Sequence, residues 1–178
     1  GKAPVIVFDD ADIPAAAEAI AAAGYFNSGQ DCTAATRVLV HSSIRQDFVD
    51  ALSAQAREAK VGMPFEADVL CGPLNNSNQL SHVLGFLDRV PSHASVTAGG
   101  EQVGSSGYFV APTVIAGLQQ DDEMSQREVF GPVITVQEFS DESEALGYAN
   151  GVEYGLASSV WTVDVARAMR CARDLDFG

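Results

Sequence analysis

Short apolar runs rich in β-branched residues alternate along this chain with alanine-rich or amphipathic stretches. The apolar runs predict strands at residues 3–8, 36–40, 94–97, 109–115, 133–139 and 156–162. The intervening stretches predict helices at residues 12–23, 43–60, 78–90, 141–149 and 164–173. This order is typical of an α/β protein, and we expect a three-layer open sheet with crossover helices on both faces.

Two of these helices have recognisable start signals. Asp12 is placed to cap the first helix, and Pro14 suits its first turn because the missing N–H costs nothing there. Residues 43–46, Ser-Ile-Arg-Gln, match a capping box, so we expect it to open the helix that ends near residue 60.

The composition limits the classes of protein to consider. With 178 residues, of which 47% are hydrophobic, the chain can bury the core of one domain without disulfide or metal staples. Ten basic against 24 acidic residues give a net charge of -14, which disfavours nucleic acid and anionic membranes as partners. No apolar run is long enough to span a membrane and no signal peptide is recognisable, so we expect a cytoplasmic protein.

The three cysteines are far apart in the sequence, at positions 32, 71 and 171. They form no C-x-x-C pair and have no histidine at ligand spacing, so neither a disulfide framework nor a metal site is predicted. Cys32 is unusual because it follows a polar loop, Asn27–Asp31, between a predicted helix and strand. Composition alone favours an inert thiol, since most cysteines are buried hydrophobes, and a reactive thiol needs support from further motifs.

Two further segments provide that support. Glu128-Val129-Phe130-Gly131-Pro132 lies 96 positions after the cysteine (128 − 32), and Gly72-Pro73-Leu74 followed by Gln79 lies between them. Together with the segment 24–38, which contains Phe-Asn-Ser-Gly-Gln-Asp-Cys, they form three motifs in a fixed order. The chain resembles the aldehyde dehydrogenase family in all three, and the resemblance covers nearly its whole length.

The resemblance assigns a role to each motif. Cys32 matches the nucleophile that attacks the aldehyde, Glu128 matches the residue that hydrogen-bonds the nicotinamide ribose, and Phe130 matches the aromatic residue against the nicotinamide. Gln79 is similar to a glutamine near the same ribose. The implied cofactor is NAD or NADP, and the implied reaction forms a thiohemiacetal and then a thioester on Cys32 before hydrolysis to the acid.

The resemblance also implies that residues 1–178 form the catalytic domain of a longer enzyme. The family's general base lies in a Glu-Leu-Gly-Gly-Lys-type stretch, of which Gly1-Lys2 matches only the end. No G-x-G-x-x-G phosphate loop is present in this chain. The phosphate-binding part lies upstream in the family, so the resemblance implies that most of the cofactor site, the oligomerisation segment and the last strand of the sheet lie outside this chain. The isolated chain is therefore predicted to be inactive, and the full-length protein is expected to be a homo-oligomer.

The substrate is less constrained. Asp31 places a carboxylate beside the nucleophile, which suits a cationic aldehyde, and Gly-Gln-Asp-Cys-Thr-Ala-Ala resembles the aminobutyraldehyde dehydrogenase-type subgroup. The same charge disfavours a thiolate, so Asp31 is also compatible with pointing away from the site. Other readings are an acylating, coenzyme A-dependent dehydrogenase, a non-catalytic scaffold of the same fold and a simple thiol esterase; the last does not explain Glu128 and Phe130.

Overall fold

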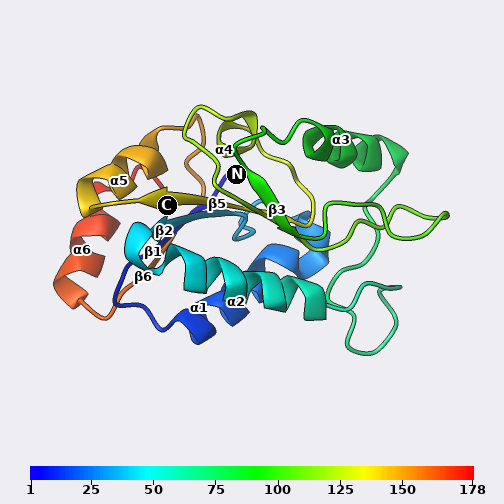
Figure 1. The fold of residues 1–178 in the computed structure, drawn as a ribbon, viewed down its shortest axis with the longest axis horizontal. Coiled ribbons are helices and arrows are strands. Elements are labelled where there is room, and N and C mark those ends of the chain that lie inside the picture. The colour runs from blue at the N-terminus through cyan, green and yellow to red at the C-terminus, as the bar shows by residue number, and fades with distance from the viewer.

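A six-stranded sheet runs through the middle of the computed structural model, which describes residues 1–178 (Figure 1). The strand order is β3-β4-β5-β2-β1-β6, and every neighbouring pair is parallel except β3 and β4. The strands are β1 (Pro4–Val7), β2 (Arg37–His41), β3 (Ser95–Ala98), β4 (Thr113–Ala116), β5 (Val133–Phe139) and β6 (Ser159–Trp161). The predicted α/β class is confirmed.

Helices cover both faces of the sheet, as expected (Figure 1). On one face, α1 (Ile13–Tyr25) and α2 (Arg45–Glu58) pack on the side chains of alternate strand residues such as Val38 and Val40. The opposite face holds the helices α3 (Ser77–Asp88), α4 (Glu123–Gln126), α5 (Glu142–Asn150) and α6 (Val165–Asp174). The central strands are buried on both sides, which is why they read as continuous apolar runs.

Side-chain caps fix the starts of most helices. Asp12 accepts a hydrogen bond from the backbone N–H of Ala15, at 3.1 Å, and Pro14 occupies the first turn of α1 as predicted. Asn76, Asp141 and Asp164 cap α3, α5 and α6 in the same way. Each cap satisfies a backbone donor that the helix itself leaves unpaired.

The predicted capping box at residues 43–46 is wrong. His41 instead caps a short 3₁₀ turn, Ser42–Ile44, by accepting from the N–H of Ser43, and α2 begins at Arg45 without a side-chain cap. The predicted strand at residues 109–115 is also shorter, because regular pairing begins only at Thr113. Pro112 has no N–H to donate, and Val110 forms only an isolated bridge with Gln102.

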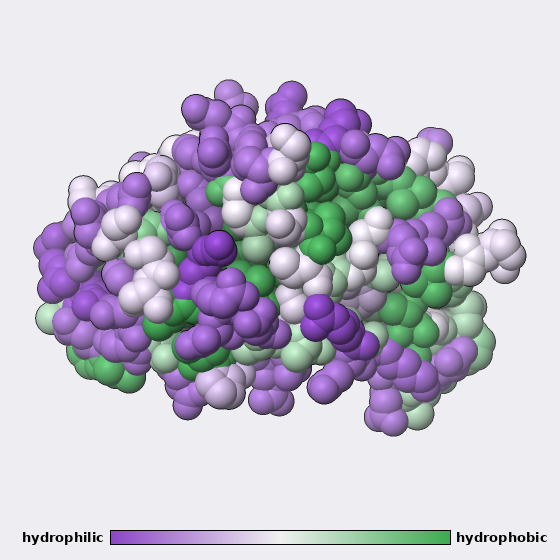
Figure 2. Space-filling view, in the orientation of Figure 1, coloured by the Kyte–Doolittle hydropathy of each residue, from purple (hydrophilic) through white to green (hydrophobic).

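In the view of Figure 2, hydrophilic side chains cover most of the face, and the larger apolar patches lie in the half that holds α3. No helix has the length and apolar character needed to cross a membrane.

Candidate active site

The segment between α1 and β2 makes an abrupt turn before Cys32. α1 ends at Tyr25, whose buried hydroxyl donates to the carbonyl of Thr113 at 3.1 Å. The next turn, η1 (Phe26–Gly29), contains three successive left-handed residues, with φ angles of 51°, 59° and 68° at Asn27, Ser28 and Gly29. That conformation costs an ordinary residue roughly 1–2 kcal/mol, so the turn needs external support. Cys32 follows it and is exposed.

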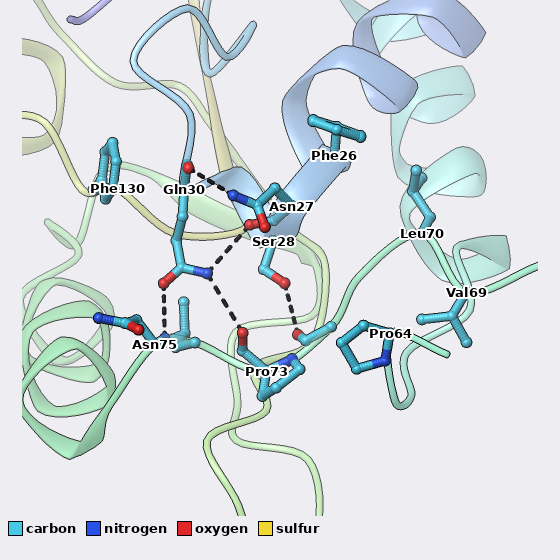
Figure 3. A pocket seen from close by; sticks show the side chains of 12 residues that line it. Phe26, Asn27, Ser28, Gln30, Pro64, Val69, Leu70, Pro73, Asn75 and Phe130 are labelled. Atoms are coloured by element: carbon cyan, nitrogen blue, oxygen red, sulfur yellow. Dashed lines mark hydrogen bonds between the residues drawn. The ribbon is translucent and has the colours of Figure 1, made fainter. Parts of the chain in front are cut away.

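Side-chain hydrogen bonds to a second loop, residues 72–75, provide this support (Figure 3). The Ser28 hydroxyl donates to the carbonyl of Gly72 at 2.6 Å. The Gln30 amide nitrogen donates to the Pro73 carbonyl at 3.4 Å, and its oxygen accepts from the Asn75 N–H at 2.8 Å. The loop that carries Cys32 is therefore tied to the Gly-Pro motif.

Backbone contact ties the same turn to the Phe130 loop. A Cβ atom on Gly29 would lie 2.0 Å from the carbonyl oxygen of Gly131, and one on Gly131 would lie 2.6 Å from a methyl group of Val83. Both positions therefore require glycine, Gly29 also because of its positive φ. Two motifs about a hundred residues apart in sequence meet at these two glycines.

Phe130 is held in an unusual backbone conformation. Its φ is 53° and its side chain is 36% exposed, whereas the preceding Val129 is buried in the core under α3. Glu128 is partly exposed, its backbone N–H donates to the Tyr154 hydroxyl at 3.3 Å, and its carboxylate accepts a hydrogen bond from the backbone nitrogen of Gly1 at 2.5 Å.

Gln79 contacts the Phe130 loop directly. Its amide nitrogen donates to the carbonyl of Val129 at 3.2 Å and to the carbonyl of Phe130 at 2.7 Å. Its amide oxygen has no partner within the chain. The predicted cofactor contact of Gln79 stays a prediction, and the structure shows that its amide nitrogen is already occupied by the Phe130 loop.

The N-terminal residues lie between Cys32 and Glu128. A Cβ on Gly1 would stand 2.4 Å from the Cys32 carbonyl oxygen, and the backbone nitrogen of the same residue donates to Glu128. The structure thus brings Cys32 and Glu128 to opposite sides of one residue.

The Asp31 carboxylate turns back onto its own loop. One oxygen accepts from both the N–H and the hydroxyl of Thr33, each at 2.7 Å. These hydrogen bonds lower the pKa of Asp31, so the carboxylate stays ionised.

A cavity of about 670 Å³ lies between the loop that precedes Cys32 and the Gly-Pro loop (Figure 3). Its wall includes Phe26, Gln30, Asn75 and Phe130 but not Cys32. Aromatic and amide groups line it together, which suits a ligand with both flat apolar and polar parts.

Sequence reasoning missed two buried basic residues. Arg37 donates to the carbonyls of Tyr148 and Ala149 and to the Gln120 side chain, and burial lowers its pKa to about 10. The Lys2 ammonium is buried without a hydrogen-bond partner. Burial lowers the pKa of Lys2 to about 7, Arg37 adds to this effect and Glu128 opposes it. The one sequence signal for these buried residues was Arg37, a charged residue inside the apolar run 36–40.

Comparison with known proteins accounts for this arrangement. The model of the aldehyde dehydrogenase family matches residues 1–178. The chain belongs to the aldehyde dehydrogenase family. An aldehyde dehydrogenase of Emericella nidulans is 40% identical over 179 residues, and a betaine aldehyde dehydrogenase of Brucella anthropi is 37% identical over 183 residues. All of this chain is covered in both comparisons, but only 36% and 38% of the relatives.

Solved structures of the family agree with the fold. A betaine aldehyde dehydrogenase from Staphylococcus aureus in complex with NAD+ has a TM-score of 0.96 at 37% identity, with 100% of this chain and 36% of that chain covered. An NAD-dependent aldehyde dehydrogenase from Sinorhizobium meliloti has the same TM-score at 35% identity, also with 100% and 36% covered. This chain therefore corresponds to a little over a third of such an enzyme.

Proposed function

We propose that this chain is the catalytic domain of a longer NAD(P)-dependent aldehyde dehydrogenase and that Cys32 is its nucleophile. The observation that carries the proposal is the convergence of the three motifs: the loop before Cys32, the Gly-Pro loop and the Phe130 loop lock together through Gln30 and the pair Gly29 and Gly131. A cysteine modified by mercaptoethanol in a structure of the Staphylococcus aureus relative supports a reactive thiol in this family.

The residues present fit a nicotinamide riboside. Phe130 offers a partly exposed aromatic ring, and Glu128 offers a partly exposed carboxylate that can accept from ribose hydroxyls. The unpaired amide oxygen of Gln79 is a second acceptor beside them. We assign these three residues to cofactor binding. Nicotinamide, when bound, supplies the hydride acceptor for the reaction.

In the proposed chemistry the Cys32 thiolate attacks the aldehyde carbon, so that a C–S bond forms and the carbonyl electron pair moves to oxygen. The backbone N–H of Cys32 donates to no group of the chain and is free to hold that oxyanion. Loss of hydride from the adduct leaves a thioester on Cys32. Water then adds to the thioester carbonyl, the C–S bond breaks, and the carboxylic acid leaves as the thiol is restored.

The choice of substrate is a finer proposal. The ionised Asp31 beside Cys32 supports an aldehyde with a positively charged group, such as 4-aminobutyraldehyde. One oxygen of its carboxylate is bound by Thr33, and the other has no partner within the chain. An ammonium or quaternary ammonium group is complementary to that charge.

The test of the function is chemical trapping. The complete enzyme is mixed with NAD+ and an aldehyde, and the reaction is quenched in acid. The enzyme is then digested, and the mass of the peptide that contains Cys32 is measured by mass spectrometry. We expect the mass of the acyl group on Cys32 and one carboxylic acid formed per NADH. Acylation elsewhere, or none while NADH accumulates, contradicts the proposal. NADH formation that requires coenzyme A and releases an acyl-coenzyme A identifies the acylating alternative.

A second test concerns the chain by itself. Because the matching general base and phosphate site belong to other parts of the family's proteins, we expect residues 1–178 alone to show no NAD-dependent aldehyde oxidation. Measurable oxidation by this polypeptide that disappears in Cys32→Ser contradicts that expectation.

A further inference from the structure

Phe130 occupies a backbone conformation that its own residue type disfavours. Its φ of 53° is left-handed, a conformation that a bulky residue keeps only where its surroundings over-determine it. Such strain persists at positions where structure fixes a side chain for a purpose. The peptide units on either side of Phe130 therefore need a group that holds them.

The Gln79 amide is that group. No backbone N–H donates to the carbonyls of Val129 or Phe130, and the Gln79 nitrogen donates to both of them. One NH₂ group with two hydrogens thus satisfies two successive carbonyls and fixes the orientation of both peptide planes. The contact at the Phe130 carbonyl, at 2.7 Å, is the shorter.

The start of α3 explains why Gln79 is available for this contact. Asn76 caps the helix by accepting from the Gln79 N–H at 2.9 Å, so Gln79 stands at the third helical position. A glutamine there often reaches back to the backbone N–H of the cap residue. Here its side chain turns to the Phe130 loop instead.

The same short segment also holds the nucleophile loop. The N–H of Asn75 donates to the Gln30 oxygen at 2.8 Å, one residue before the helix cap. A continuous path therefore runs from Gln30 through residues 75–79 to Phe130. At one end of this path the Gln30 side chain accepts from the backbone N–H of Asn75. At the other end the Gln79 side chain donates to the Phe130 loop.

We propose that Gln79 is a positioning residue whose amide nitrogen holds Phe130 in its left-handed conformation and sets the Phe130 loop relative to the loop of Cys32. The proposal rests on the proposed function for its consequence in catalysis, and its structural part is independent of it. It adds a second role for Gln79, carried by the nitrogen, to the acceptor role of the oxygen.

Two substitutions separate the two roles in the complete enzyme. Gln79→Glu keeps the size and an acceptor oxygen but has no donor, whereas Gln79→Lys keeps donors and has no acceptor. Gln126→Glu is the matched control, because the Gln126 nitrogen also donates to two backbone carbonyls, those of Gln120 and Gly151.

The first measurement is hydrogen exchange without substrates at the amides of Thr113 and Val133, which donate to the carbonyls of Pro132 and Gly131. We expect exchange about tenfold faster in Gln79→Glu, because this variant loses both hydrogen bonds to the Phe130 loop, and wild-type rates in Gln79→Lys and Gln126→Glu. Unchanged exchange in Gln79→Glu overturns the proposal, whether or not the enzyme oxidises aldehydes. Equal acceleration in Gln126→Glu overturns it as well.

The second measurement is kinetic. We expect the KM for NAD+ to rise about tenfold in Gln79→Glu, which loses the donor that positions Phe130, and to rise also in Gln79→Lys, which loses the acceptor assigned to the ribose, with the KM for the aldehyde unchanged in both. A KM for NAD+ that rises only in Gln79→Lys shows that the Gln79 oxygen alone matters and overturns the positioning role. A wild-type enzyme without NAD-dependent oxidation contradicts the proposed function. The hydrogen-exchange measurement then still tests whether Gln79 holds Phe130 in place.

Discussion

The backbone of Gly29 lies against the carbonyl group of Gly131, so closely that a Cβ at position 29 would stand 2.0 Å from the oxygen. Gly29 belongs to the loop that carries Cys32, and Gly131 follows Phe130. This contact fixes the proposed nucleophile and the proposed nicotinamide platform relative to one another. It needs no side chain at all, which is why only glycine fits.

We predict that Gly29→Ala destabilises the protein by about 3 kcal/mol or more, because the methyl group collides with backbone and φ is positive. Gly104→Ala is the control, because its φ of 74° is also positive but nothing lies within 4 Å of the added Cβ. We expect this variant to lower the free energy of unfolding by only about 1 kcal/mol. Urea unfolding measures both free energies. Equal losses would show that the close contact adds nothing.

Lys2 makes stability depend on pH. Its pKa is about 7 in the folded chain, against 10.5 as the ordinary value, because it is buried beside Arg37. The unfolded chain binds the extra proton between those two pH values, so the free energy of unfolding rises with pH across that window. We predict a gain of at least about 1 kcal/mol from pH 7 to pH 9 relative to Lys2→Met, measured by chemical denaturation at each pH. Parallel pH profiles for the two proteins contradict the prediction.

Asp31 tests the choice of substrate. Asn has nearly the same shape without the charge, so we predict that Asp31→Asn lowers kcat/KM for an aminoaldehyde about tenfold more than for an uncharged aldehyde of equal length. The comparison is made in the complete enzyme. An unchanged preference rejects the proposed role of Asp31 and leaves that of Cys32 intact.

Much of the fold could be predicted because the strands differ sharply from their surroundings. The bounds of β5, residues 133–139, were predicted correctly, since a parallel strand buried on both faces is a continuous apolar run flanked by Pro132 and Ser140. The strand predicted at residues 109–115 began too early, because the apolar pattern does not show where pairing with the neighbouring strand starts. The capping box failed because the His41 side chain competes for the same turn.

The chemistry of the site was predicted less completely. The motifs singled out Cys32, Glu128 and Phe130, whose roles stay predictions, but they did not show the interactions that position these residues. The Ser28 and Gln30 contacts join residues more than forty positions apart, and no local pattern specifies such pairing. The Lys2 environment likewise arises only when β1 and β2 bring it beside Arg37.

The most direct measurement of the central claim is NADH formation by the complete enzyme with Cys32→Ala, compared with Cys171→Ala. Cys171 is a buried thiol of α6 and serves as the control for loss of a sulfur atom. The account predicts a loss of at least about 10³-fold in kcat for Cys32→Ala, since no other exposed thiol can form the thioester, and a near-normal rate for Cys171→Ala. A near-normal rate in Cys32→Ala would contradict the assignment of Cys32 as the nucleophile.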